Sequence, residues 1–149
     1  MSTTPVELID DRLLVEHLLS DRHVPNVQIA TTPLWYFRAC RAAVLGAGGQ
    51  LSGPFIELND EHQGAAITRL LELDDDIDLA APRDTVPVMA QLAQRHPQLN
   101  PLNLGAVASA LVLEATVVLS VKGAAGVLPS VLDSEGVPWR VSGTNERPT

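Results

Sequence analysis

Short apolar runs and longer helical patterns alternate along the chain of 149 residues. Runs rich in Val, Ile and Leu predict strands, which we place at 6–9, 27–31, 77–80, 116–119 and 137–141. Apolar residues spaced three and four apart predict the intervening helices, which we start near residues 11, 33, 59, 85, 103 and 123. This alternation predicts an α/β fold, a three-layer α/β/α sandwich around a central, mainly parallel sheet of about five strands.

Capping residues set the expected helix ends. Thr32 precedes Pro33 at one helix start, and Asn103 is expected to cap a short apolar helix that ends at Leu113. The glycines at 46, 48 and 49 are expected to end the helix that starts at residue 33, and Gly136 to end a helix over 123–135. One domain over 1–141 with a loose polar tail at 142–149 follows from this reading.

Composition and charge narrow the class of protein. Hydrophobic residues make up 46% of the chain and charged residues 19%, which excludes a disordered protein. The formal net charge of −8 argues against a nucleic-acid partner. The single Cys40 fits a reducing cytoplasm, and polar residues interrupt the apolar stretch 102–121, so no membrane span is expected.

Two acids offer the first candidate chemistry. Asp10 and Asp11 directly follow the first strand, at the edge where parallel sheets bind ligands. Asp11 has an equally good structural explanation as the cap of the next helix. The acidic run 74–76 is expected to be a hydrated loop, and the four histidines lack the paired spacing of a metal site.

Three of the five aromatic residues are consecutive, Trp35, Tyr36 and Phe37. Three neighbouring helical positions span about 200°, so at least one of these rings should lie near the surface. Trp35 and Tyr36 have two interpretations. They pack inward with the Tyr36 hydroxyl in water, or they form a contact surface for a protein partner or a second copy of the chain.

Three segments resemble the PIN-domain family of metal-dependent ribonucleases. Residues 8–11 followed by 13–15 look like the family's opening strand and first acidic ligand. Residues 31–34 leading to 38–42 are similar to its second strand and helix. Residues 106–120 together with 136–141 look like its last helix, central strand and closing strand. The resemblance covers most of the chain.

That resemblance implies about four carboxylates around Mg²⁺ or Mn²⁺, which help to generate a hydroxide nucleophile. Asp10 matches the first acid, but Arg38, Asn103 and Val121 with Lys122 beside it stand where the other three are expected. Arg38 is therefore expected to pair with Asp10, and also with Asp11, in place of a metal.

The resemblance thus implies a catalytically inactive PIN-like domain with a binding or regulatory role. Its vestigial pocket would comprise Asp10, Asp11, Arg38, Asn103 and Lys122, with no cofactor and with Asp10 as the only weak metal candidate. Its partner would be a protein or a second copy of the chain.

Two other functions stay open. The first is a toxin-like ribonuclease that depends on Mg²⁺ or Mn²⁺ and draws its acids from elsewhere. The acids that we consider for this rearranged site are Asp11, Asp60, Glu61 and Asp84. The second is a self-associating scaffold built on Trp35 and Tyr36.

Overall fold

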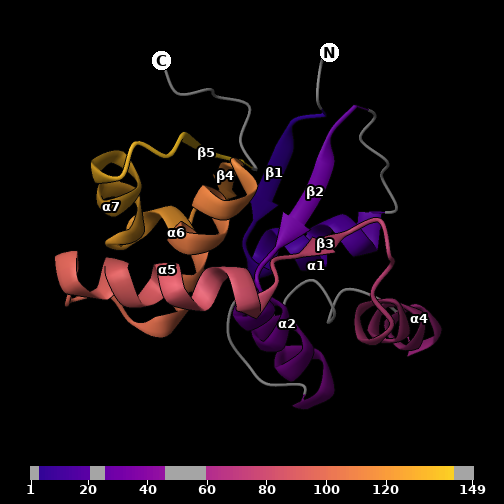
Figure 1. The fold of residues 1–149 in the computed structure, drawn as a ribbon. Coiled ribbons are helices and arrows are strands. Elements are labelled where there is room, and N and C mark those ends of the chain that lie inside the picture. Colours follow the sequence, from indigo (N-terminus) through magenta and orange to yellow (C-terminus); the bar gives the residue numbers. More distant parts are fainter. Residues whose placement is uncertain (1–3, 21–25, 46–59, 143–149) are drawn as a thin grey trace.

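A parallel β-sheet forms the centre of the computed structural model, which describes residues 4–20, 26–45 and 60–142. Within these residues the sheet has five strands in the order β3-β2-β1-β4-β5, and every neighbouring pair is parallel. The strands are β1 (Val6–Ile9), β2 (Gln28–Thr31), β3 (Asp78–Leu79), β4 (Thr116–Leu119) and β5 (Trp139–Val141). The predicted α/β fold with a parallel central sheet is therefore confirmed (Figure 1).

Helices cover both faces of this sheet. The described helices are α1 (Asp11–Ser20), α2 (Pro33–Leu45), α4 (Asp60–Leu71), α5 (Pro82–Arg95), α6 (Pro101–Leu113), the 3-10 turn η1 (Gly123–Ala125) and α7 (Leu128–Ser134). In Figure 1, α5, α6 and α7 gather on the left of the view, and α4 lies on the right.

Two apolar cores separate the three layers. Successive strand residues point to opposite faces of a sheet, so Leu8 and Ile9 enter different cores. Leu8 and Val117 belong to the core built with α5, α6 and α7, whereas Ile9 and Val118 belong to the core built with α1, α2 and α4. The near-continuous apolar strands in the sequence are those of a sheet that is buried on both faces.

Two helices begin two or three residues before their predicted positions. Helix α6 begins at Pro101, and the Asn100 side chain accepts a hydrogen bond of 2.9 Å from the backbone N–H of Asn103. Asn103 therefore provides the capped amide and is not the cap. Helix α5 begins at Pro82, where a proline fits the first turn because no N–H is needed there.

The predicted helix over 123–135 is two separate elements. Gly126 has φ −99° and ψ −151°, an extended conformation that separates η1 from α7. Gly136 follows α7 at φ +72°, the left-handed conformation expected for a glycine that ends a helix. Strand β5 starts at Trp139, two residues later than predicted.

Three predictions fall outside the described residues: the glycines at 46, 48 and 49, residue 59 at a predicted helix start and positions 143–149 of the tail. None of the helices in the described ranges combines the length and the apolar character needed to cross a membrane.

The start of α6 provides a test of the observed cap. Asn100→Ala removes the side-chain acceptor of the Asn103 amide and should lower the free energy of unfolding by about 1 kcal/mol. Asn103→Ala keeps that acceptor and should cost less. Urea unfolding of both variants measures the difference, provided that the denaturant slope is unchanged. An equal loss in the two variants would contradict the assignment.

Candidate functional site

The strand order creates a switch point between β1 and β4. The chain proceeds from β1 outward to β2 and β3 and then returns to the other side of β1 to form β4 and β5. Open parallel sheets bind ligands at the carboxyl ends of the strands that flank such a point. Asp10 directly follows β1 and Ser120 directly follows β4, so both residues lie there.

The Asp10 carboxylate joins these two strand ends. Its Oδ1 accepts a hydrogen bond of 3.0 Å from the Leu13 amide. Its Oδ2 accepts hydrogen bonds from the Ser120 amide at 2.8 Å and from the Ser120 hydroxyl at 2.7 Å. Asp10 is only 2% exposed, and a buried carboxylate of this kind needs such donors to offset the loss of water.

Gly123 allows the turn after β4 to close over this carboxylate. The Gly123 amide donates to the Ser120 hydroxyl oxygen at 3.1 Å. A Cβ atom at Gly123 would overlap Asp10 Oδ2 and would lie 3.2 Å from the Ser120 hydroxyl oxygen. The close approach of the backbone therefore requires glycine here.

Arg38 on α2 pairs with Asp11. The Arg38 Nε lies 3.2 Å from Asp11 Oδ2, a contact that is an ion pair without the alignment of a hydrogen bond. Asp11 Oδ1 accepts from the Arg12 amide at 2.9 Å. The predicted pairing of Arg38 with Asp10 is wrong, because the Asp10 oxygens face Leu13 and Ser120 instead.

Burial, two neighbouring charges and backbone hydrogen bonds all act on the pKa of Asp11, and the hydrogen bonds from the Arg12 and Asp11 amides lower it. Burial raises the pKa of the Asp11 carboxyl group, the positive charge of Arg38 lowers it, and the neighbouring Asp10 charge raises it. The net result is a pKa above the usual value, since desolvation is the largest effect.

One pocket of about 130 Å³ opens at this edge of the sheet. The five residues predicted to share a pocket all line it: Asp10, Asp11, Arg38, Asn103 and Lys122. The topology brings them together from the ends of β1 and β4, the second turn of α2 and the first turn of α6. Their descent from a metal site stays a prediction.

The donor set does not fit the divalent cation that the PIN resemblance implies. Magnesium and manganese need several oxygen ligands. In the described part of the chain, no group of three or more Asp, Glu, His or Cys side chains is arranged to hold a metal. Both Asp10 oxygens already accept protein hydrogen bonds, and Arg38 stands against Asp11.

Of the two interpretations of the aromatic residues on α2, inward packing describes Trp35. Trp35 is 4% exposed and packs into the core with α5, α6 and α7. Tyr36 is half-buried, and its hydroxyl donates to the Leu70 carbonyl at 2.7 Å, so that hydroxyl is not simply in water. Phe37 is the exposed ring, at 59%.

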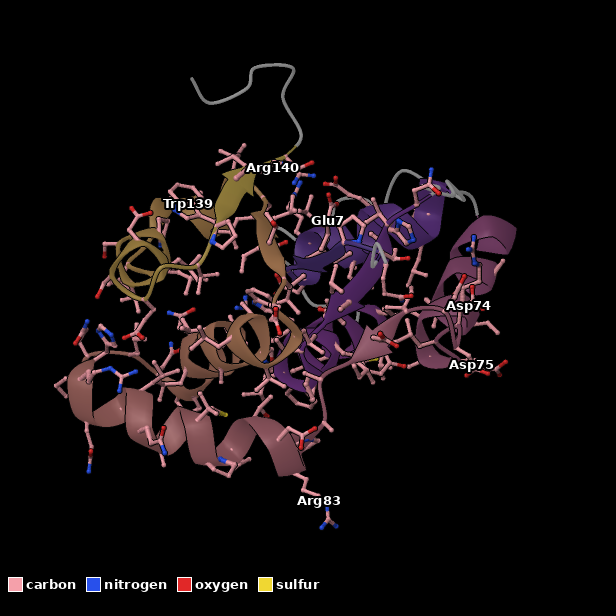
Figure 2. All side chains as sticks on the ribbon, turned by 45° about the horizontal axis from the view of Figure 1, so that its top comes forward. Glu7, Asp74, Asp75, Arg83, Trp139 and Arg140 are labelled. Carbon is pink, nitrogen blue, oxygen red and sulfur yellow. The ribbon has the colours of Figure 1, made fainter. Side chains whose placement is uncertain are left out.

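Of the acids considered for a rearranged site, Asp11 lines the pocket. Asp84 is exposed in the first turn of α5 and does not line the pocket. The side chains of Asp60 and Glu61 lie outside the described residues. Asp74 and Asp75 are exposed beside α4, as expected for a hydrated loop (Figure 2).

Ser120 and Gly123 are the site residues that sequence reasoning missed. The available signal was a hydroxyl residue placed directly after the most apolar strand, at the same sheet edge as Asp10. A small residue three positions later was consistent with a tight turn.

Comparison with known proteins supports the fold alone. No family model matches the chain, and no curated protein matches it. The solved structure of VapBC-1 from nontypeable Haemophilus influenzae is similar to this chain with a TM-score of 0.55 and 14% sequence identity. The match covers 90% of this chain and 96% of that one. This likeness is consistent with a PIN-like fold.

Substitution at Gly123 tests the contact with Asp10. Gly123→Ala should lower the free energy of unfolding by about 1–3 kcal/mol, because the new methyl group overlaps a carboxylate that is held by several hydrogen bonds. Gly126→Ala lies in the same loop with open space around the new Cβ and should cost much less. Thermal and urea unfolding compare the two, and equal stabilities would contradict the packing.

Removal of Arg38 tests the ion pair. Arg38→Gln should raise the pKa of Asp11 further, because the only nearby charge that lowers it is lost. Arg41→Gln, an exposed position on the same helix, should leave that pKa unchanged. Side-chain carboxyl NMR during a pH titration measures both. An unchanged Asp11 pKa in Arg38→Gln would mean that the pair does not form in solution.

The same pKa determines the sign of the pH effect on stability. Because the folded-state pKa of Asp11 lies above its unfolded value, folding favours the protonated carboxyl. Its contribution to stability is therefore present below the unfolded pKa and is lost as the pH rises through the folded pKa. The loss of Arg38 should make this decline steeper.

Proposed function

We propose that this chain is a catalytically inactive PIN-like domain with a binding or regulatory role. The observation that carries the proposal is the state of the Asp10 carboxylate, the one acid that matches the PIN pattern. Its oxygens accept hydrogen bonds from Leu13 and Ser120, and it is almost fully buried. A carboxylate engaged in this way is poorly placed to bind an ion that needs oxygen ligands.

The charges around Asp10 support the same conclusion. Arg38 occupies the side of the pocket where the resemblance implies a second acid, and it neutralises Asp11. Lys122 and the neutral Asn103 stand where further acids are implied. Protein cations here take the electrostatic role that a metal has in an active PIN domain.

A protein partner or a second copy of this chain is the binding partner that we propose. The net charge of −8 disfavours a nucleic acid through long-range repulsion. We also propose a cytoplasmic location, in keeping with the single, unpaired Cys40.

Metal-dependent cleavage is the direct test. The purified chain should not cut single-stranded RNA with Mg²⁺ or Mn²⁺ above the level of a metal-free control, and calorimetry should show no stoichiometric Mn²⁺ binding. Cleavage that requires Mn²⁺ and is lost in Asp10→Ala would overturn the proposal and favour the ribonuclease alternative.

A variant with acidic residues at three pocket positions provides the positive control for metal binding. Arg38→Glu combined with Asn103→Asp and Lys122→Asp would place three acids around the pocket beside Asp10 and Asp11. This variant should gain Mn²⁺ binding at one site, because clustered carboxylates are stabilised by a divalent cation. Circular dichroism first verifies that the variant folds.

A further inference from the structure

The pocket at the sheet edge has a charge opposite to that of the protein as a whole. Three basic residues line it, Arg12, Arg38 and Lys122, against two acidic ones, Asp10 and Asp11. Arg12 is also paired with Glu16, at 3.4 Å between Arg12 Nε and Glu16 Oε2, so Arg38 and Lys122 are the basic groups that the pocket offers. The whole chain carries a net charge of −8. An excess of basic side chains in one concave site of an acidic protein calls for a specific explanation.

The two acids lie beneath the pocket surface and are already engaged. Asp10 is 2% exposed and accepts hydrogen bonds from Leu13 and Ser120. Asp11 is 8% exposed, its Oδ1 accepts from the Arg12 amide, and its Oδ2 faces Arg38. Neither carboxylate offers a ligand an accessible negative charge.

The basic groups are, by contrast, accessible. The Arg38 side chain is 44% exposed, and its contact with Asp11 uses Nε. A guanidinium has four more N–H donors on its two terminal nitrogens, in a planar arrangement that suits two oxygens of one anion. Lys122 is exposed at the start of η1, on the loop that follows β4.

The size of the pocket limits what it accepts. The volume of this pocket is about 130 Å³. Sites for whole nucleotides or drug-sized ligands are usually about 300–1,000 Å³. One carboxylate or phosphate group fits this space, and a base with its sugar does not.

We infer that this pocket binds one oxyanion, a carboxylate or a phosphate group, through Arg38 and Lys122. This inference rests on the proposed function, because a cation in the same pocket would exclude it. Arg38 both neutralises Asp11 and presents its terminal nitrogens to the ligand. The neutral Asn103 side chain lies at the same pocket and offers amide donors to the anion. The oxyanion comes from an acidic side chain of a partner protein or from free phosphate.

NMR titration of the full chain, with EDTA present, tests the inference. Two probes are added separately: inorganic phosphate, and a capped Gly-Glu-Gly peptide with capped Gly-Gln-Gly as its neutral control. We expect saturable shifts of the Asn103, Lys122 and Gly123 amides with a dissociation constant on the order of 1 mM, the weak range for so small a ligand. Saturation by the glutamate peptide alone identifies a protein carboxylate, and saturation by phosphate alone identifies phosphate. Saturation by both shows a general oxyanion site.

Matched charge variants show whether the binding is specific. Lys122→Gln and Arg38→Gln should each weaken binding about tenfold or more, the scale of a charge-assisted hydrogen bond. Arg83→Gln removes the same charge from an exposed side chain that points away from the molecule at the start of α5 and should change binding less than about twofold (Figure 2). Lys122 is exposed, so its variant should fold even if the Arg38 variant does not.

Two results would overturn the inference. The first is shifts that grow linearly without saturation for both probes. The second is an equal loss of binding in Arg83→Gln and Lys122→Gln, which indicates non-specific attraction of anions. If the chain neither cuts RNA nor binds either probe, the inferred oxyanion site is wrong and the proposed inactivity stands. A chain that cuts RNA with Mn²⁺ yet binds the probes in EDTA refutes only the proposed inactivity.

Discussion

The buried Asp10 carboxylate is the interaction on which the rest of the site depends. It connects the end of β1 to the end of β4 through Ser120, across 110 positions of sequence. A charge taken out of water is costly unless each oxygen finds donors, and here three N–H and O–H groups supply them. This geometry determines where the η1 turn runs and requires glycine at position 123. The carboxylate is therefore a structural centre, and the chemistry of the pocket depends on its other side chains.

The arrangement of the sheet could be predicted because its strands carry a strong signal. Strand β4 was predicted at its observed bounds, since a strand made almost wholly of apolar residues is stable between two layers of helices. Helix starts were less predictable. Asn100 and Asn103 are both good caps by residue type, and Pro101 between them decides which one acts, because its fixed φ suits the first position of the helix. The break at Gly126 depends on how the loop packs, which local pattern does not report.

Five residues of the pocket were predicted, but Ser120 and Gly123 were missed. Of the two pairings expected for Arg38, the one with Asp11 is observed and the one with Asp10 is not. The PIN resemblance implied one site for Asp10 and Lys122, and the parallel strands that precede them bring their carboxyl ends to one edge of the sheet. Which carboxylate Arg38 would meet depends on side-chain direction. The Asp10 side chain lies toward β4 and the Asp11 side chain toward α2. The two directions differ because Asp10 and Asp11 are consecutive residues at the junction of strand and helix. Trp35 is buried because it lies in the first turn of α2, which lies over this edge of the sheet.

The two edge strands of the described sheet are short. Strand β3 has two residues and β5 has three. A peptide that adds as a further strand to a sheet needs a row of unpaired backbone N–H and C=O groups on the edge strand. The short edge strands β3 and β5 offer few such groups. Binding by strand addition is therefore disfavoured on either side. Any protein that docks on this chain would have to recognise helices and loops, through side chains more than through main-chain pairing.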